Sequence, residues 1–230
     1  MKSRQIQKHE FHIEDKKVEV YPGSGSRSAV IYLNTFAGEG DNVYQVLRSA
    51  DSPDFTLVAV SGLNWNHDMA PWDIPTISEG HTPCTGGAGD YLQLLTERIM
   101  PQAEKLAPDV SWRGLAGYSL AGLFAAYSLY QTDLFSRIAC ISGSLWFPGF
   151  LEYAASHEMK RLPDCAYFSI GDRENRTRNP YLKTVRENTE KMERLCAESG
   201  IHTFFQLNQG NHYKNAAQRT AAGIAWLLNR

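Results

Sequence analysis

Short apolar runs alternate along the chain with longer segments in which apolar residues recur every three or four positions. The short runs are rich in β-branched and aromatic residues, which is typical of buried strands. They comprise residues 29–33, 55–60, 114–118, 138–141, 166–170 and 203–207. The longer segments have the spacing of helices with one buried face. They comprise residues 42–50, 90–106, 120–131, 181–199 and 216–228.

This alternation predicts a fold of the α/β class, because strands that alternate with helices form a mostly parallel central sheet flanked by helices. Residues 11–13 and 17–21 precede the alternating part and predict an N-terminal antiparallel hairpin. The 230 residues are 43% hydrophobic. A chain of this size buries roughly 70–75% of its unfolded surface as one unit, so we expect a single domain over residues 1–230.

Charge excludes some classes of partner. The formal net charge is −2, and the 23 basic and 25 acidic residues are interspersed, so no basic face indicates a nucleic-acid partner. The first twenty residues are charged throughout, and no later stretch has the roughly 18 consecutive apolar residues of a membrane span. We therefore expect a cytoplasmic protein that does not enter a membrane. Its oligomeric state is left open.

The four cysteines are widely spaced and form no C-x-x-C pair. A chain of this size does not need disulfides for stability, so we expect reduced, buried thiols that serve in packing. They are Cys84, Cys140, Cys165 and Cys196.

Ser119 lies in the segment GYSLAG, between a predicted strand and a predicted helix. A nucleophile elbow has this order: a strand stops abruptly, a serine adopts a sparsely populated backbone conformation, and a helix starts at once between very small neighbours. The common pattern has glycine two residues after the serine, where this chain has Ala121. Ser119 is therefore a candidate nucleophile, with a serine in a tight strand–helix turn as the alternative.

Candidate partners for Ser119 follow the last two predicted strands, in the order nucleophile, acid, histidine. Asp172 and Glu174 come directly after residues 166–170, and His212 comes after residues 203–207. We predict His212 as the general base. We favour Glu174 as the acid, because an aspartate after glycine commonly caps a turn by accepting backbone N–H groups. Asp172 remains the alternative.

The oxyanion hole of such a site uses two backbone N–H groups. Leu120, directly after the nucleophile, supplies the first. The second is expected in the loop of residues 34–40 that follows an early strand, at Phe36 or at the neighbouring Thr35. A phosphate-binding loop is disfavoured because GxxxxGK[ST] is absent.

Aromatic and basic residues gather in the loops on the same side of the predicted sheet. Trp65, Trp146 and Phe147 are candidates for an apolar substrate site, with ordinary packing as the alternative, which we favour for Trp72. Arg173 belongs to an arginine cluster that could attract an anionic substrate or simply be solvated. The other members of this cluster are Arg176 and Arg178.

Possible metal ligands occur in one loop-rich stretch, but their spacing matches no common zinc signature. They are His67, Asp68, His81 and Cys84. We therefore predict no metal site and no cofactor.

Beyond these patterns, the chain resembles the putative esterase branch of the α/β-hydrolase fold, which includes trilactone siderophore esterases, esterase D-type enzymes and feruloyl esterases. The resemblance covers nearly the whole chain. It rests on GYSLAGLFAAYSLY around Ser119, SGSLWFPGF at 142–150, GDRENRTRNP at 171–180 and GNHYKNAAQRTAAGIAWLL at 210–228. Residues 63–72 are also similar to a loop of siderophore-esterase-like members.

This resemblance implies an α/β-hydrolase fold and serine ester hydrolysis, with Ser119 as nucleophile and His212 as base. Some siderophore esterases work with a serine–histidine pair, so the resemblance leaves open whether Glu174 takes part. The function we predict is hydrolysis of a small-molecule carboxylic ester, with a siderophore trilactone as the leading substrate. The alternatives are a feruloyl, aryl or small acyl ester or thioester, acyl transfer to another acceptor, and a non-catalytic binding protein of the same fold.

Overall fold

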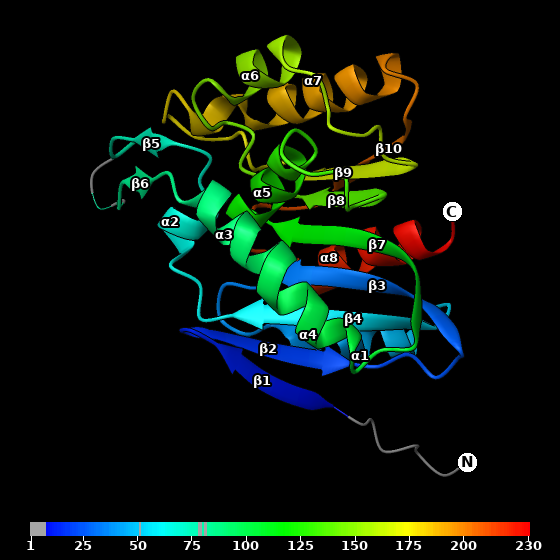
Figure 1. Ribbon diagram of the computed structural model, residues 1–230. Coiled ribbons are helices and arrows are strands. Elements are labelled where there is room, and N and C mark those ends of the chain that lie inside the picture. The colour runs from blue at the N-terminus through cyan, green and yellow to red at the C-terminus, as the bar shows by residue number, and fades with distance from the viewer. Residues whose placement is uncertain (1–7, 51, 78–79, 81) are drawn as a thin grey trace.

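The computed structural model describes residues 8–50, 52–77, 80 and 82–230, and most of its strands form one central sheet (Figure 1). Eight strands lie in the order β1-β2-β4-β3-β7-β8-β9-β10. They are β1 (His9–Ile13), β2 (Lys16–Tyr21), β3 (Arg27–Asn34), β4 (Phe55–Ser61), β7 (Asp109–Tyr118), β8 (Arg137–Ile141), β9 (Cys165–Gly171) and β10 (His202–Asn208). A separate two-stranded sheet pairs β5 (Asp73–Ile74) with β6 (Cys84–Thr85).

Strand direction confirms the predicted architecture. Strands β4, β3, β7, β8, β9 and β10 are all parallel to one another. Strand β2 pairs antiparallel with both β1 and β4, so the N-terminal hairpin is present. The carboxyl ends of the parallel strands therefore meet at one edge of the sheet, which is where ligands bind in such folds.

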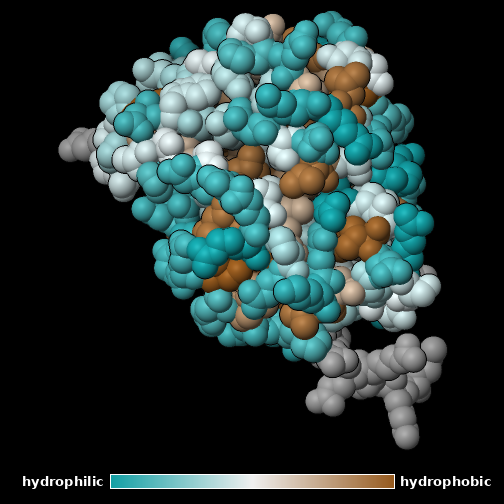
Figure 2. All heavy atoms as spheres, viewed as in Figure 1, coloured by the Kyte–Doolittle hydropathy of each residue, from teal (hydrophilic) through white to brown (hydrophobic). Residues whose placement is uncertain are grey.

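Helices cover both faces of this sheet and enclose two hydrophobic cores. On one face, α1 (Gly40–Ser49) packs beside α8 (Ala216–Leu228), behind the sheet in Figure 1. The other face is covered by α3 (Ala88–Leu94), α4 (Met100–Glu104), α5 (Leu120–Ser128), α6 (Phe150–Ser156) and α7 (Val185–Glu198). Figure 2 shows the outer surface on this side as mostly hydrophilic, with apolar residues in small separate groups.

The helix predicted over residues 90–106 contains an irregular turn. Helix α3 runs into a π-helical turn, η1 (Leu95–Ile99), before α4 begins. Pro101 explains the irregularity, because proline has no N–H to donate and its ring clashes with the carbonyl one turn earlier in a regular α-helix. A wider π turn just before the proline relieves that conflict.

Other boundaries differ modestly from those predicted. The segment predicted from residue 181 opens with a 3₁₀ turn, η2 (Leu182–Thr184), before α7. Strand β7 starts at Asp109 rather than near residue 114, and α5 ends at Ser128. The sequence patterns did not predict α2 (Trp65–Asp68), α6 or the β5–β6 pair, because elements this short carry no readable periodicity.

Helix α5 is the element that holds the candidate nucleophile in place. All nine of its residues are buried, and it packs against β7 and β8. A helix that is apolar all round is fixed on every side by its neighbours. The residue at its N-terminus, Ser119, therefore has a rigid support.

Among the described residues, no helix combines the length and the apolar character needed to span a membrane.

Candidate active site

Ser119 occupies a strained turn between β7 and α5. Its backbone angles are φ 60° and ψ −125°, a conformation that an L-residue adopts at a cost of about 1–3 kcal/mol. Gly117 makes the turn possible, since a Cβ at this position would lie 2.2 Å from the carbonyl oxygen of Ala121. The Cβ of Ala121 itself lies 2.7 Å from that point. Ala121 thus fits in place of the usual glycine because the residue opposite it has no side chain.

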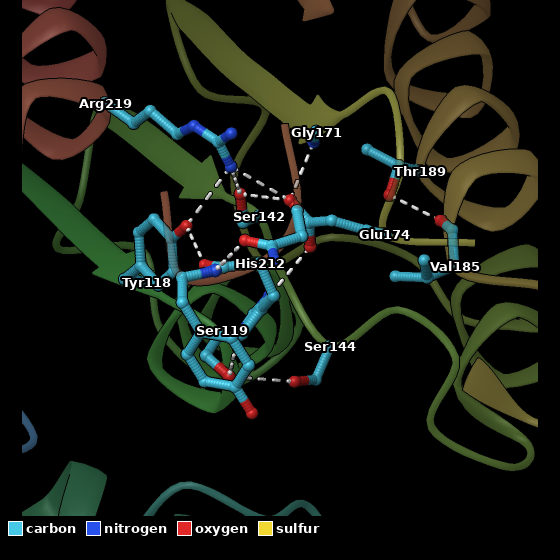
Figure 3. A network of polar contacts seen from close by, with 12 residues as sticks. Tyr118, Ser119, Ser142, Ser144, Gly171, Glu174, Val185, Thr189, His212 and Arg219 are labelled. Carbon is cyan, nitrogen blue, oxygen red and sulfur yellow. Dashed lines mark hydrogen bonds and ion pairs between the residues drawn. The ribbon is translucent and has the colours of Figure 1, made fainter. Parts of the chain in front are cut away.

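Three side chains from separate loops form a continuous hydrogen-bonded chain (Figure 3). The Ser119 hydroxyl donates to Nε2 of His212 across 3.1 Å. The Nδ1–H of His212 donates to Oε2 of Glu174 across 2.7 Å. Glu174 follows β9 and His212 follows β10, so both approach the nucleophile from the carboxyl-terminal edge of the sheet. This geometry is that of a serine–histidine–carboxylate triad.

Glu174 is held as a buried carboxylate. Its side chain is 3% exposed, and Oε1 accepts the Gly171 N–H at 2.7 Å and the Ser142 hydroxyl at 2.9 Å. Burial by itself would raise the pKa of this carboxyl. The contact with His212 has the largest opposing effect, and the hydrogen bonds from Gly171 and Ser142 add to it, so the pKa lies below its ordinary value. The group therefore stays ionised beside the imidazole.

Asp172 has the capping role that we named as its alternative. Its Oδ1 accepts the backbone N–H of Gly210 at 2.7 Å, and this hydrogen bond is the main cause of its lowered pKa. Asp172 thereby ties the loop after β9 to the loop after β10 that carries His212. The contact with the imidazole is made by Glu174.

Arg219 completes the buried network, and sequence reasoning missed it. Its side chain is 4% exposed, and its guanidinium lies 3.1 Å from Oε1 of Glu174 (Figure 3). It also donates to the carbonyl of Gln209 at 3.1 Å. The sequence did contain a sign of this role. Arg219 is one helical turn before Gly223, so it lies on the apolar side of a predicted helix. A charged residue on a buried face needs a partner of opposite charge.

Two further hydroxyl groups join this network. Ser142 lies 3.3 Å from the Arg219 guanidinium and has a positive φ of 44°. Tyr118 also lies 3.3 Å from that guanidinium, and its hydroxyl donates to the backbone carbonyl of His212 at 2.6 Å. The backbone as well as the ring of His212 is therefore anchored.

The three backbone N–H groups predicted as candidates for the oxyanion hole differ in their hydrogen bonding. The Thr35 N–H donates to the carbonyl of Val60 at 2.8 Å, which removes Thr35 as an alternative. Within the described part of the chain, the N–H groups of Leu120 and Phe36 have no protein acceptor. Both residues line cavities that include Ser119. Leu120 and Phe36 therefore remain our proposed donors.

Ser119 opens on two cavities of about 400 and 500 Å³. Trp65, Trp146 and Arg173, three of the predicted substrate-binding residues, line the smaller one, and Trp65 also lines the larger. The prediction that Phe147 binds substrate is wrong. Its side chain is only 2% exposed and packs against Trp72 in the core, with ring centroids 5.7 Å apart. The backbone turns between Trp146 and Phe147, so the two neighbours point to different environments.

Two of the four residues considered as metal ligands, His67 and Asp68, have other partners. Nδ1 of His67 lies 2.8 Å from the Thr85 hydroxyl, and Asp68 forms a 2.8 Å ion pair with Lys16. Cys84 is buried, and His81 lies outside the described residues. Over the residues that the structure describes, no three histidine, cysteine, aspartate or glutamate side chains are grouped to hold a metal ion.

Comparisons with known proteins identify the family and the fold. A family model described as putative esterase matches residues 15–218. The chain is also 22% identical to the uncharacterized protein YbbA of Bacillus subtilis (strain 168). The aligned 213 residues cover 87% of this chain and 85% of that protein.

Several solved structures share the fold at low sequence identity, among them two at 18%. The siderophore hydrolase EstA from Aspergillus nidulans matches with a TM-score of 0.76 over 98% of this chain and 95% of that one. An IroE-like serine hydrolase from Shewanella oneidensis matches with a TM-score of 0.77 over 98% of this chain and 80% of that one. The fold is thus that of α/β-hydrolase-type esterases. The chain belongs to the putative esterase family.

Proposed function

We propose that this protein is a serine esterase that hydrolyses a small-molecule carboxylic ester through an acyl-enzyme intermediate on Ser119. The observation that carries the proposal is the continuous chain from Ser119 through His212 to Glu174, with contacts of 3.1 and 2.7 Å. The strained backbone of Ser119 supports it, because strain of this kind is retained where a function requires it. Together these features favour catalysis over the alternative of a non-catalytic binding protein.

In the proposed mechanism, Nε2 of His212 takes the hydroxyl proton while Oγ of Ser119 attacks the ester carbonyl carbon. The N–H groups of Leu120 and Phe36 stabilise the negative charge that develops on the carbonyl oxygen. The histidine then gives its proton to the departing alcohol oxygen, which leaves an acyl-serine. A water molecule, deprotonated by the same histidine, releases the acid and restores the serine.

Glu174 keeps the imidazole in the required tautomer and stabilises the imidazolium that forms. Its contact at 2.7 Å and its ionised state support a triad rather than a serine–histidine pair. Replacing the carboxylate of a buried triad by an amide lowers turnover by about 10⁴ in a well-studied protease. We therefore expect Glu174→Gln to lower kcat strongly and Asp172→Asn to have a much smaller effect. The reverse order would reassign the acid.

A siderophore trilactone remains our leading substrate. The similarity to a protein named as a siderophore hydrolase supports this choice. The two cavities of about 400 and 500 Å³ beside Ser119 also support it, because cavities of this size are typical of sites for larger ligands. An aryl, feruloyl or small acyl ester or thioester is the alternative substrate. Acyl transfer to an alcohol or thiol would use the same acyl-serine, and adding such acceptors to the assay separates transfer from hydrolysis.

The direct test is hydrolysis of p-nitrophenyl acetate by the protein and by Ser119→Ala and His212→Ala, each checked for folding by circular dichroism. We expect both variants to lose at least about 10³ in kcat, since members of a triad act as a unit. Full activity in a folded Ser119→Ala variant would refute the proposal. Siderophore lactones are the first natural substrates to assay after this control.

We propose the cytoplasm as the site of action. All four cysteines are free and buried, which fits a reducing compartment.

A further inference from the structure

The two cavities at Ser119 meet along a shared wall. Four residues line both of them: Trp65, Ser119, His212 and Tyr213. The reacting groups therefore lie at the junction of two separate spaces rather than at the end of one pocket. A substrate that fills this site has one substituent on each side of the reacting carbonyl.

The smaller cavity, called here the arginine lobe, is cationic. Arg173 and Arg176 line it and are exposed, and among the described residues neither side chain forms an ion pair. The carboxylate in this lobe, Glu174, is already engaged by His212 and Arg219 and is 3% exposed. Asp172 lies close enough to both arginines for them to help lower its pKa, but it does not line this lobe. Among the described lining residues, the charge that is not already paired is therefore positive.

The larger cavity, called here the apolar lobe, is aromatic and lacks a cation among its lining residues. Phe36 is 67% exposed and Tyr213 is 86% exposed, which is unusual for large aromatic side chains beside a cavity. Phe36 packs edge-on against Trp65 with ring centroids 5.2 Å apart, so it is held in position. The one carboxylate at this lobe, Glu39, disfavours an anionic ligand there.

We propose that the two lobes select an ester with two unlike arms, and this inference rests on the proposed function. The arm with an anionic group lies in the arginine lobe, where the guanidinium groups of Arg173 and Arg176 attract it. The aromatic or aliphatic arm lies in the apolar lobe against Phe36 and Tyr213. The ester group sits between them at Ser119. Hydrolysis consumes one water and yields an acid and an alcohol, one product from each lobe.

A set of matched esters tests this selection. Benzyl hydrogen glutarate carries both arms, benzyl valerate lacks the carboxylate, and ethyl hydrogen glutarate lacks the aromatic ring. The mirror compound, 4-(phenylacetoxy)butanoate, places the ring on the acyl side and so covers the opposite orientation. We expect one of the two-armed esters to exceed both one-armed esters in kcat/KM, by about tenfold for the aromatic arm and about fivefold for the anionic arm.

Variants assign each preference to its lobe. In Arg173→Gln/Arg176→Gln, the ratio of kcat/KM for the two-armed ester over benzyl valerate is expected to fall to near one. Arg178→Gln is the matched control, because this exposed arginine lies in the same loop but lines neither lobe. Added salt is expected to lower the ratio in the unmodified protein, since exposed charge pairs are screened.

For the apolar lobe, Phe36→Ala is expected to lower the ratio of the two-armed ester over ethyl hydrogen glutarate by about tenfold, because the Phe36 ring lines this lobe but not the arginine lobe and its backbone N–H is kept. Tyr181→Ala is its control, because Tyr181 is also an exposed aromatic residue, at 41%, and lines neither cavity. Equal rates for all four esters, or ratios that the controls change as much as the lobe variants do, would overturn the inference.

Failure of this inference is distinguishable from failure of the proposed function. If the protein hydrolyses p-nitrophenyl acetate in a Ser119-dependent manner but shows no preference among the esters, the lobes do not select substrate. If no ester is hydrolysed at all, the esterase proposal itself is wrong.

Discussion

Arg219 offers the sharpest test of the network behind the candidate active site. Replacing it with methionine keeps an unbranched side chain of similar length but removes the guanidinium. Glu174 then loses its 3.1 Å ion pair while its side chain stays 97% covered. The hydrogen bonds that the Arg219 guanidinium donates to the Gln209 carbonyl and to the Tyr118 and Ser142 hydroxyls are lost as well.

The magnitude follows from the burial of both partners, which are 4% and 3% exposed. Removing one member of a buried ion pair costs about 3–5 kcal/mol, because the remaining buried charge loses its oppositely charged partner. A protein of this length loses about 2–4 °C in Tm for each kcal/mol. We therefore expect Arg219→Met to lower Tm by about 6–20 °C, whereas Arg178→Met, at an exposed site, should change the free energy of unfolding by less than about 0.5 kcal/mol.

A double-mutant cycle separates this charge effect from simple loss of packing. Urea denaturation would be measured for the unmodified protein, Arg219→Met, Glu174→Gln and the double variant. Because the double variant contains neither buried charge, its destabilisation should be smaller than the sum of the single changes by about 1–3 kcal/mol. Additive single changes would show that the ion pair does not stabilise the site, and the reasoning about Arg219 would then be wrong.

Three further predictions concern the same region. The folded-state pKa of Glu174 is below its ordinary value of 4.5. Ionised Glu174 therefore stabilises the folded protein fully above pH 4.5, and this stabilisation is lost as the pH falls through the lowered folded-state pKa. Urea titrations at several acid pH values should show a loss of stability that is smaller in Glu174→Gln. Ser119→Gly should raise the free energy of unfolding relative to Ser119→Ala by about 1 kcal/mol, because glycine adopts a φ of 60° without strain, and equal stabilities would show that the elbow is not strained. Gly117→Ala should lower both stability and turnover, because its Cβ would lie 2.2 Å from the carbonyl oxygen of Ala121; a variant with unchanged Tm and kcat would contradict the elbow geometry.

Much of the architecture was predictable because its signals are local. The apolar runs that became β3, β4, β7, β8, β9 and β10 are short and bounded by polar loops. Once the sheet is parallel, all loops after its strands share one edge. The positions of Ser119, Glu174 and His212 after β7, β9 and β10 are therefore enough to predict that the three residues lie close together.

The remaining features depend on three-dimensional contacts. Arg219 is recognisable as unusual on a buried helix face, but its partner Glu174 lies 45 residues away and could not be identified from spacing. Trp146 and Phe147 are adjacent and similar in character, so only the path of the loop decides which one reaches the cavity. The proline at position 101 is a local sign of an irregular helix, but the apolar periodicity of residues 90–106 did not predict the π turn before it.

The central claim is that Ser119 is the nucleophile, and labelling with a fluorophosphonate followed by intact-mass analysis and peptide mapping tests it most directly. We expect a single adduct on the peptide that contains Ser119, with no adduct in Ser119→Ala and slow labelling in His212→Ala. An adduct at another residue, or a folded protein that acquires none, would contradict the account.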